Sequence, residues 1–421
     1  MGGMLRGPVA STSPRLPEPS CHKDGQGDLA RFSEIRNILW IPEHPHPKLN
    51  GRWLLADGGS LRTVTPDGLV ETFAQHEALE TKGSMPSPVR LDCLALAPAR
   101  EGQQGPRIFV SDSARGVVWI LEGQGQFRIL TAPSEWKPTG LSVDPAGHLY
   151  LADGARRMVQ RCAPDGKITQ VGQRDELALG RDGKNGTGSL CAPGSLVVDP
   201  YTGDLLVADG CAIRRITPEG DIATLAGRTT KGAYADWPAE TPLSHQGALG
   251  QGIPCFGRLA AITLAGTDLY IADPDNNALR RLNLATGELV TLLGGPGLDR
   301  TRFGPLHRNS GTNQAAIAGP VAIAFDGAGT CLVANGHALF QLVLARPEAD
   351  GCQDARKGRP EQIAFLNPPL PLWKTLVDQL PATPTLEDTA ETMTAVGASL
   401  YAQSPIVWEA LKGLIDSKSP I

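Results

Sequence analysis

GLSVDPAGHLYLADGARRMVQRCAPDGKITQVG at residues 140–172 and GSLVVDPYTGDLLVADGCAIRRITPEGDIATLAG at residues 194–227 repeat one pattern. Each stretch has an apolar run ending in Asp-Pro, a turn with Gly, a second apolar run ending in Ala-Asp, and two further short runs separated by a Pro-Asp/Glu-Gly turn. Short alternating runs divided by Gly, Pro and Asp predict four strands in one antiparallel meander. A lone sheet of this size cannot bury both faces, so its recurrence predicts a stacked or radial array of sheets.

Six copies of this unit are visible, each marked by the residue that ends its second run. The shortest spacing between markers is 41 positions, from Asp112 to Asp153, which matches a bare four-strand unit of about 40–45 residues. The extra length in other copies falls between one unit and the next, in connections at 75–89, 173–193, 228–257 and 295–319. The markers are Asp57, Asp112, Asp153, Asp209 and Asp273, with Asn335 in the sixth copy.

The pattern of an apolar strand, Asp-x-x-Gly, Leu-Tyr-[Ile/Leu]-Ala-Asp and Asn-x-[Leu/Ile]-Arg-Arg resembles NHL repeats. The stretch LYIADPDNNALRRLNLATGELVTLLG at 269–294 is the best match, and the resemblance extends over residues 35–345. It implies an all-β fold, a six-bladed β-propeller of four-stranded blades, which leaves only short protected sheet edges. The run EQIAFLN at 361–367 is a candidate for the outer strand of the sixth blade.

Three regions follow from composition. Residues 1–31 are rich in Pro, Gly and Ser and are predicted to be disordered. Residues 32–367 form the predicted propeller. Residues 368–421 form a predicted helical appendage, because helical spacing over 372–380 is followed by Ser404-Pro405, a helix-start signal. The appendage either packs on the propeller or serves as a partner-binding module.

Charge and cysteine content limit the function classes. A net charge of -5 over 421 residues gives no single-sign field for a nucleic acid or a membrane surface. No run reaches the roughly 18 apolar residues of a membrane span, and the N-terminus lacks a secretory signal, so a cytoplasmic location is the default and non-classical secretion stays open. Eight cysteines include no C-x-x-C pair. Reduced thiols are expected, although strand geometry leaves a Cys191–Cys211 disulfide open.

The recurring residues favour structural roles over catalysis. An Asp repeated in every blade is expected to accept backbone N–H bonds at a turn. In the pairs Arg214-Arg215 and Arg280-Arg281, one Arg is expected to brace the adjacent blade and the other to face solvent. These assignments leave the connections between blades as the place where binding groups are expected.

In such a meander, the connections between blades and the turns from second to third strands share one face. Loops on a rigid scaffold commonly carry binding groups, and aromatic residues beside Arg are typical of binding hot spots. The alternative is that Trp237 and Phe256 anchor their own loops. The predicted binding residues are Arg174, Arg181, Lys184, Arg228, Tyr234, Trp237, His245, Phe256, Arg302, Phe303, His307 and Arg308.

The sequence therefore predicts a non-catalytic scaffold for a protein, peptide or glycan partner, with no cofactor. The alternative that the resemblance implies is a metal-dependent enzyme, a calcium lactonase or a zinc amidating lyase, with ligands near the central channel. The first strands offer one carboxylate, Asp92, and no histidine. His44-Pro-His46 has ligand chemistry without a third partner nearby and is expected to form a solvated turn.

Overall fold

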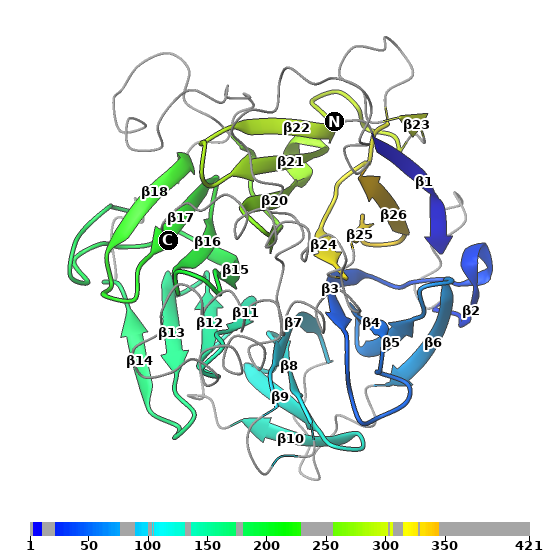
Figure 1. The fold of residues 1–421 in the computed structure, drawn as a ribbon, viewed down its shortest axis with the longest axis horizontal. Helices are drawn as coiled ribbons and strands as arrows, with labels where there is room; N and C mark the ends of the chain where they lie inside the picture. Colours follow the sequence, from blue (N-terminus) through cyan, green and yellow to red (C-terminus); the bar gives the residue numbers. More distant parts are fainter. Residues whose placement is uncertain are drawn as a thin grey trace, which may run out of the picture. The chain divides into compact units, whose positions relative to one another are not determined.

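The structure is a computed structural model that describes residues 3–10, 22–75, 89–99, 103, 105–130, 136–173, 180–228, 256–301, 304–305, 315–326 and 329–344. Six antiparallel sheets are arranged around a common centre (Figure 1). This confirms the predicted six-bladed β-propeller. The predicted helices of the 368–421 region lie outside the described residues.

Each blade has four strands, and the first strand of each lies nearest the centre of the ring (Figure 1). Blades 1 to 3 contain β3 (Ile35–Ile41), β4 (Arg52–Asp57), β5 (Ser60–Val64), β6 (Leu69–Ala74); β7 (Leu91–Ala97), β8 (Arg107–Asp112), β9 (Val117–Glu122), β10 (Gln126–Leu130); β11 (Gly140–Val143), β12 (Leu149–Asp153), β13 (Met158–Cys162), β14 (Ile168–Val171). Blades 4 to 6 contain β15 (Pro193–Val198), β16 (Leu205–Asp209), β17 (Ala212–Ile216), β18 (Ile222–Gly227); β19 (Ala261–Ala265), β20 (Asp268–Asp273), β21 (Ala278–Asn283), β22 (Leu289–Gly294); β24 (Ala322–Phe325), β25 (Thr330–Ala334), β26 (Leu339–Leu344) and β1 (Gly3–Ala10).

The hydrophobic core lies between neighbouring blades. Leu54 and Leu61 of blade 1 share one cluster with Leu94 and Val110 of blade 2, and all four are buried. Because each sheet is covered on both faces, second strands such as β16 are buried along their whole length. This accounts for the continuous apolar runs before each marker Asp.

The N-terminal strand closes the ring, so the disorder expected over residues 1–31 does not hold for residues 3–10 and 22–31, the part of that range that the structure describes. β1 is the fourth strand of blade 6 and pairs antiparallel with β26. It takes the place expected for 361–367, and those residues lie outside the described part. The outer edge of β26 would otherwise present unpaired N–H and C=O groups. A strand held through its backbone needs little apolar sequence, so composition did not reveal it.

Connections before three blades run along the outer sheet edges. β2 (Gly25–Gln26) pairs with β6, and β23 (Gly304–Pro305) pairs with β1. At blade 4 the Gly183 N–H donates to the Ile222 carbonyl at 2.9 Å, and the reverse bond is 2.8 Å. The expectation that the long connections all decorate one rim is therefore wrong for these segments, because they cover edge strands instead.

The segment before β3 is completed by one turn of 3-10 helix, η1 (Gly27–Leu29). A second such turn, η4 (Pro274–Asn276), joins β20 to β21. Among the residues that the structure describes, no helix has the length and apolar character required to traverse a lipid bilayer.

Candidate binding surface

Two rims of the ring are distinguished by their turns. The connector rim holds the connections into each first strand and the turns between second and third strands. The distal rim holds the turns between first and second strands and between third and fourth strands.

At the connector rim, the marker aspartates tie each blade to the segment that enters it. All five are fully buried, and each accepts a backbone N–H from a residue just before the first strand, at 2.7–3.3 Å. This confirms the predicted backbone-binding role of the repeated Asp. The donors to Asp57, Asp112, Asp153, Asp209 and Asp273 are Glu34, Arg90, Lys137, Cys191 and Gly257, respectively.

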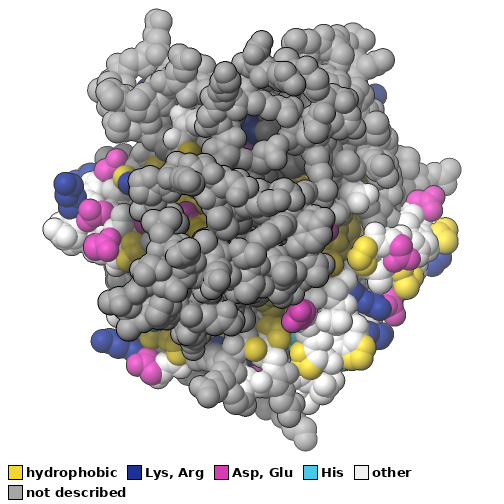
Figure 2. All heavy atoms as spheres, viewed as in Figure 1, with side chains coloured by type: hydrophobic (Ala, Val, Ile, Leu, Met, Phe, Trp, Pro, Cys, Tyr) yellow, Lys and Arg dark blue, Asp and Glu magenta, His cyan; other side chains and the backbone are white. Residues whose placement is uncertain are grey.

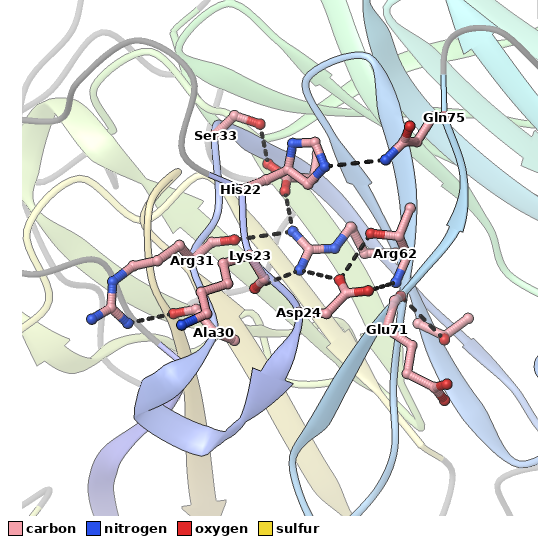
Figure 3. Close-up of polar contacts among 12 residues, drawn as sticks. His22, Lys23, Asp24, Ala30, Arg31, Ser33, Arg62, Glu71 and Gln75 are labelled. Atoms are coloured by element: carbon pink, nitrogen blue, oxygen red, sulfur yellow. Dashed lines mark hydrogen bonds and ion pairs between the residues drawn. The ribbon is translucent and has the colours of Figure 1, made fainter.

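A buried arginine in blade 1 joins the marker Asp to the preceding segment (Figure 3). Arg62 is fully buried and donates to Asp57 Oδ2 at 2.9 Å and to Asp24 Oδ1 at 2.9 Å. Asp24 in turn accepts from the N–H and the hydroxyl of Thr72 on β6, at 2.9 and 2.8 Å. Arg62 also donates to the Lys23 carbonyl at 3.0 Å. We call this set a connector clamp: a third-strand Arg, the marker Asp, a connection Asp and a fourth-strand Thr.

Blade 4 contains a second connector clamp with the same parts. Arg214 is fully buried and donates to Asp209 at 3.1 Å and to Asp182 at 2.9 Å, while the Thr224 hydroxyl donates to Asp182 at 2.8 Å. Arg214 therefore braces the connection that enters its own blade, and the prediction that it braces the adjacent blade is wrong. Its neighbour Arg215 is partly exposed, as predicted.

The connector clamp places Asp24 in a strongly polar environment. Burial acts to raise the pKa of Asp24, but the Thr72 N–H and hydroxyl and the Arg62 guanidinium outweigh it, so the pKa lies below its usual value. The folded chain therefore favours the ionised carboxylate. The stabilisation it gives is present at neutral pH and is lost as the pH falls through the folded pKa.

Blade 5 has the same arginine, and an aromatic ring lies over its guanidinium, as the Phe32 ring lies 5.4 Å from the Arg62 guanidinium in blade 1. Arg280 lies 3.8 Å from Asp273, and its guanidinium stands 4.9 Å from the centre of the Phe256 ring. Its register partner Thr291 matches the clamp threonines. Phe256 is fully buried in the core, so its predicted place on the binding surface is wrong. It fits the alternative, an aromatic residue that anchors its own loop.

The remaining blades lack a third-strand Arg at this register position. Trp119, Gln160 and Phe340 occupy it in blades 2, 3 and 6. In blades 2 and 3 an Arg of the turn lies 3.8 Å from the marker Asp instead. Blade 6 carries Asn335 as its marker, so buried cation and carboxylate are both replaced. A buried charge without its partner is strongly destabilising, which explains why the two are replaced together.

The predicted binding residues are not gathered at one rim. Arg181 and Lys184 belong to the segment on the outer edge of blade 4, which reaches the distal rim where the Gly186 N–H donates to the Gly220 carbonyl at 3.0 Å. Arg228 is exposed and lies at the connector rim beside Cys211, whose carbonyl accepts its N–H at 3.2 Å. The others, Arg174, Tyr234, Trp237, His245, Arg302, Phe303, His307 and Arg308, lie outside the described residues.

Charged side chains converge where β3 and β7 begin at the connector rim. Asp92 Oδ1 lies 3.4 Å from both Arg36 and Arg90, and its Oδ2 accepts the Ser113 N–H at 3.1 Å. The carboxylate singled out from the sequence thus has two cationic neighbours. Within the described residues, no group of three or more His, Cys, Asp or Glu side chains is placed to hold a metal ion.

In the last four residues before each first strand and in the turns between second and third strands, exposed cations outnumber exposed acids among the described residues. Arg90, Lys137 and Arg258 are exposed where the chain enters blades 2, 3 and 5. Glu34 and Asp275 are the exposed acids there, and Asp275 accepts the Arg258 N–H at 2.8 Å. The outer edges, by contrast, carry both signs interspersed (Figure 2). Sequence reasoning missed these cations, although each stands within four residues before a first strand.

The His44-Pro-His46 turn lies at the distal rim and is held by its own imidazoles. His44 Nδ1 accepts the His46 N–H at 3.1 Å, and His46 Nδ1 accepts the Lys48 N–H at 3.1 Å. Each neutral ring therefore carries its proton on Nε2, which leaves no lone pair there for a metal. The prediction that this turn is solvated is wrong for His44, which is 6% exposed.

We expect this turn to make the protein less stable in mild acid. Burial lowers the pKa of His44, and the neighbouring His46 lowers it further. As the pH falls below about 6.5, the His44 imidazole is protonated in the unfolded chain but stays neutral in the folded chain. The free energy of unfolding therefore decreases until the pH falls below the folded pKa. Asn at position 44 keeps an acceptor near Nδ1 but cannot titrate. Thermal melting should show a smaller loss in His44→Asn than in the wild type between about pH 7 and 5; equal losses contradict the assignment.

Cys191 and Cys211 are half-buried at the connector rim and are not joined in a disulfide. Burial raises the pKa of Cys211, and the nearby carboxylates of Asp275 and Asp273 raise it further. A raised pKa keeps the Cys211 thiol protonated and weakens it as a nucleophile.

The geometry defines the class of protein as a six-bladed β-propeller, and comparisons with solved structures agree. A protein of unknown function from Bacteroides thetaiotaomicron has a TM-score of 0.57 at 17% identity, covering 82% of this chain and 76% of that one. An auxiliary nutrient binding protein from Bacteroides ovatus has a TM-score of 0.57 at 13% identity, covering 81% and 76%. At such identities the likeness concerns the fold.

Sequence comparison finds a more limited similarity. No protein-family model matches the chain. The mouse peptidyl-glycine alpha-amidating monooxygenase is 28% identical over 158 residues, and the rat protein matches equally. The match spans 36% of this chain and only 14% of each of these relatives.

Proposed function

We propose that this chain is an NHL-like propeller that acts as a non-catalytic binding scaffold, and that its partner is an acidic segment of a protein or peptide. The observation that carries the proposal is the excess of exposed cations at the connector rim, on a chain whose net charge is -5. The aromatic and basic residues of the 229–255 and 302–314 connections stay predictions for the same surface.

The scaffold beneath these cations is rigid. The marker aspartates hold the segments that carry Arg90, Lys137 and Arg258 through backbone hydrogen bonds, from the Arg90 and Lys137 N–H groups and from the N–H of Gly257 beside Arg258. The side chains of Lys137, Arg228 and Arg258 are all exposed to solvent. Pre-placed charges of one sign speed the encounter with an oppositely charged partner and set its orientation.

Charge reversal at the connector rim tests the proposal. The triple variant Arg90→Glu, Lys137→Glu, Arg258→Glu should fold. The exposed Lys137 and Arg258 sites should each change stability by less than about 0.5 kcal/mol, and Arg90→Glu should cost about 1 kcal/mol more because Arg90 forms an ion pair with Asp92. Proteins captured by the wild-type chain from its source cells and identified by mass spectrometry should bind the purified triple variant more than about tenfold more weakly.

The matched control reverses as many charges elsewhere. Arg128, Lys167 and Lys184 are exposed on outer edges or at the distal rim. Changing them to Glu gives the same net charge and should leave affinity within about twofold, since rim contacts are untouched. Equal losses in the two triple variants would show a net-charge effect and would contradict the proposed surface.

The similarity to the amidating monooxygenases favours a second candidate, a metal-dependent propeller enzyme. Metal analysis of the purified full chain separates the two. A stoichiometric content of zinc or calcium that resists dialysis supports the enzyme. A metal-free chain that still captures an acidic partner through Arg90, Lys137 and Arg258 supports the scaffold.

A further inference from the structure

Blade 6 differs from the other blades in how its fourth strand is supplied. In blades 1 to 5 the fourth strand follows the third through a short turn, as between β17 and β18. In blade 6 the strand beside β26 is β1, from the opposite end of the described chain (Figure 1). Among the described residues, every other pair of third and fourth strands is joined by a short turn. The pairing of β1 with β26 has no such turn to hold the two strands together.

This pairing is also irregular. Gly3, Met4 and Leu5 pair in register with β26, and the register then shifts twice, before and after Pro8. Proline has no N–H to donate, and Gly lowers strand stability, so β1 is a weak strand by composition. By contrast, β25 pairs with β26 without a shift over its whole length. Separation of β1 breaks this irregular pairing and the two-residue pairing of β1 with β23, and it leaves β24, β25 and β26 paired.

The chain between β1 and blade 1 is long enough to allow such a separation. Residues 11–21 link Ala10 to His22, and fully extended they would span about 40 Å at about 3.3–3.6 Å per residue. The segment after them is fixed, because Asp24 is clamped by Arg62 and Thr72. β1 can therefore leave its ring while the connector clamp of blade 1 stays closed. The vacated edge of β26, LFQLVL, is rich in strand-forming residues, and its unpaired N–H and C=O groups can pair with another strand.

We propose that the outer edge of β26 is a strand-acceptor site and that its alternative occupant is β1 of a second copy of this chain. Two rings that exchange their N-terminal strands keep every backbone pairing of the single ring, so the exchange needs no new contact. The exchange is independent of the partner proposed for the connector rim.

Peptide capture by a nicked full-length chain tests the site directly. A specific protease site replaces residues 12–18, the folded protein is cut, and a fluorescent synthetic peptide of residues 1–12 is added in excess. One labelled peptide per chain should appear by native mass spectrometry and fluorescence anisotropy. A Leu5→Pro peptide should bind at least about tenfold more weakly, because Pro removes a donor and clashes in a paired strand. No capture, or equal capture of both peptides, overturns the proposal.

A second variant tests exchange between intact chains. Deleting residues 13–20 shortens the link between β1 and its own ring and should raise the dimer fraction measured by light scattering. Adding Leu5→Pro to the same variant should return the dimer fraction to that of the wild type. A shortened chain that stays monomeric with an unchanged melting temperature contradicts the exchange. If the shortened chain does not fold, peptide capture by the nicked chain remains the test of the proposal.

Discussion

Replacing Arg214 by Met is expected to lower the free energy of unfolding by about 3–5 kcal/mol, whereas Arg215→Met should change it by less than about 1 kcal/mol. The two arginines are neighbours on β17, yet Arg214 is fully buried between Asp209 and Asp182. The Arg215 side chain is 46% exposed and lies 3.8 Å from Asp204. Removing Arg214 leaves the Asp209 carboxylate buried without its cation, and chemical denaturation of both variants measures the difference.

A compensated replacement supplies the control. Blade 6 has Asn335 at the marker position and the buried Phe340 at the register position of the arginine. The double variant Asp209→Asn, Arg214→Phe removes both buried charges and should therefore be more stable than Arg214→Met alone, by about 1–2 kcal/mol. If the double variant is the less stable of the two, the penalty does not come from an unpaired buried charge.

The sequence predicted the blades and the role of the marker aspartates because both are repeated. A residue that recurs at the same place in each unit, as Asp153 and Asp209 do, serves something that each unit needs, here a backbone bond to the incoming segment. The same reasoning failed for features that occur in only some blades. Arg62 and Arg214 are buried by the connection that precedes their blade, and strand periodicity carries no information about that connection.

A signal for the connector clamp was nevertheless present. Asp24 stands in Lys-Asp-Gly and Asp182 in Arg-Asp-Gly, each eight positions before a buried apolar residue, Phe32 or Leu190. Comparison of the connections with each other, rather than of the strands, would have shown that they carry a shared structural motif. The long connections were interpreted as binding loops because of their length. For this reason Lys184 was assigned to the binding surface, although it lies in the segment that covers the outer edge of blade 4.

Closure of the ring was less accessible to sequence reasoning. Gly3–Ala10 contains Gly and Pro and has no strand periodicity, although its backbone pairs with β26. The cations at the connector rim were missed for a related reason. Arg90 and Lys137 are isolated in sequence, and they become neighbours of one surface only when the blades are set side by side.

Deletion of residues 1–31 should leave a chain that does not fold into the ring, whereas deletion of a disordered tail would shift stability by less than about 0.5 kcal/mol. The deletion removes β1, so β26 becomes an open apolar edge. It also removes Asp24 and the carbonyls of Lys23 and Arg31, which bind the fully buried Arg62. Circular dichroism and size-exclusion chromatography should show an unfolded or aggregated chain.

Two milder variants separate the contributions of strand and clamp. Deletion of residues 1–21 removes β1 and leaves the blade 1 clamp in place. Asp24→Asn weakens only that clamp, and we expect it to lower the free energy of unfolding by about 1–3 kcal/mol, the usual contribution of a hydrogen bond to a charged group. Because the pKa of Asp24 is lowered in the folded chain, the difference between wild type and Asp24→Asn should narrow below about pH 4, where the unfolded carboxyl is protonated. A soluble ring with normal melting after deletion of 1–31 would show that neither β1 nor the clamp holds the propeller closed.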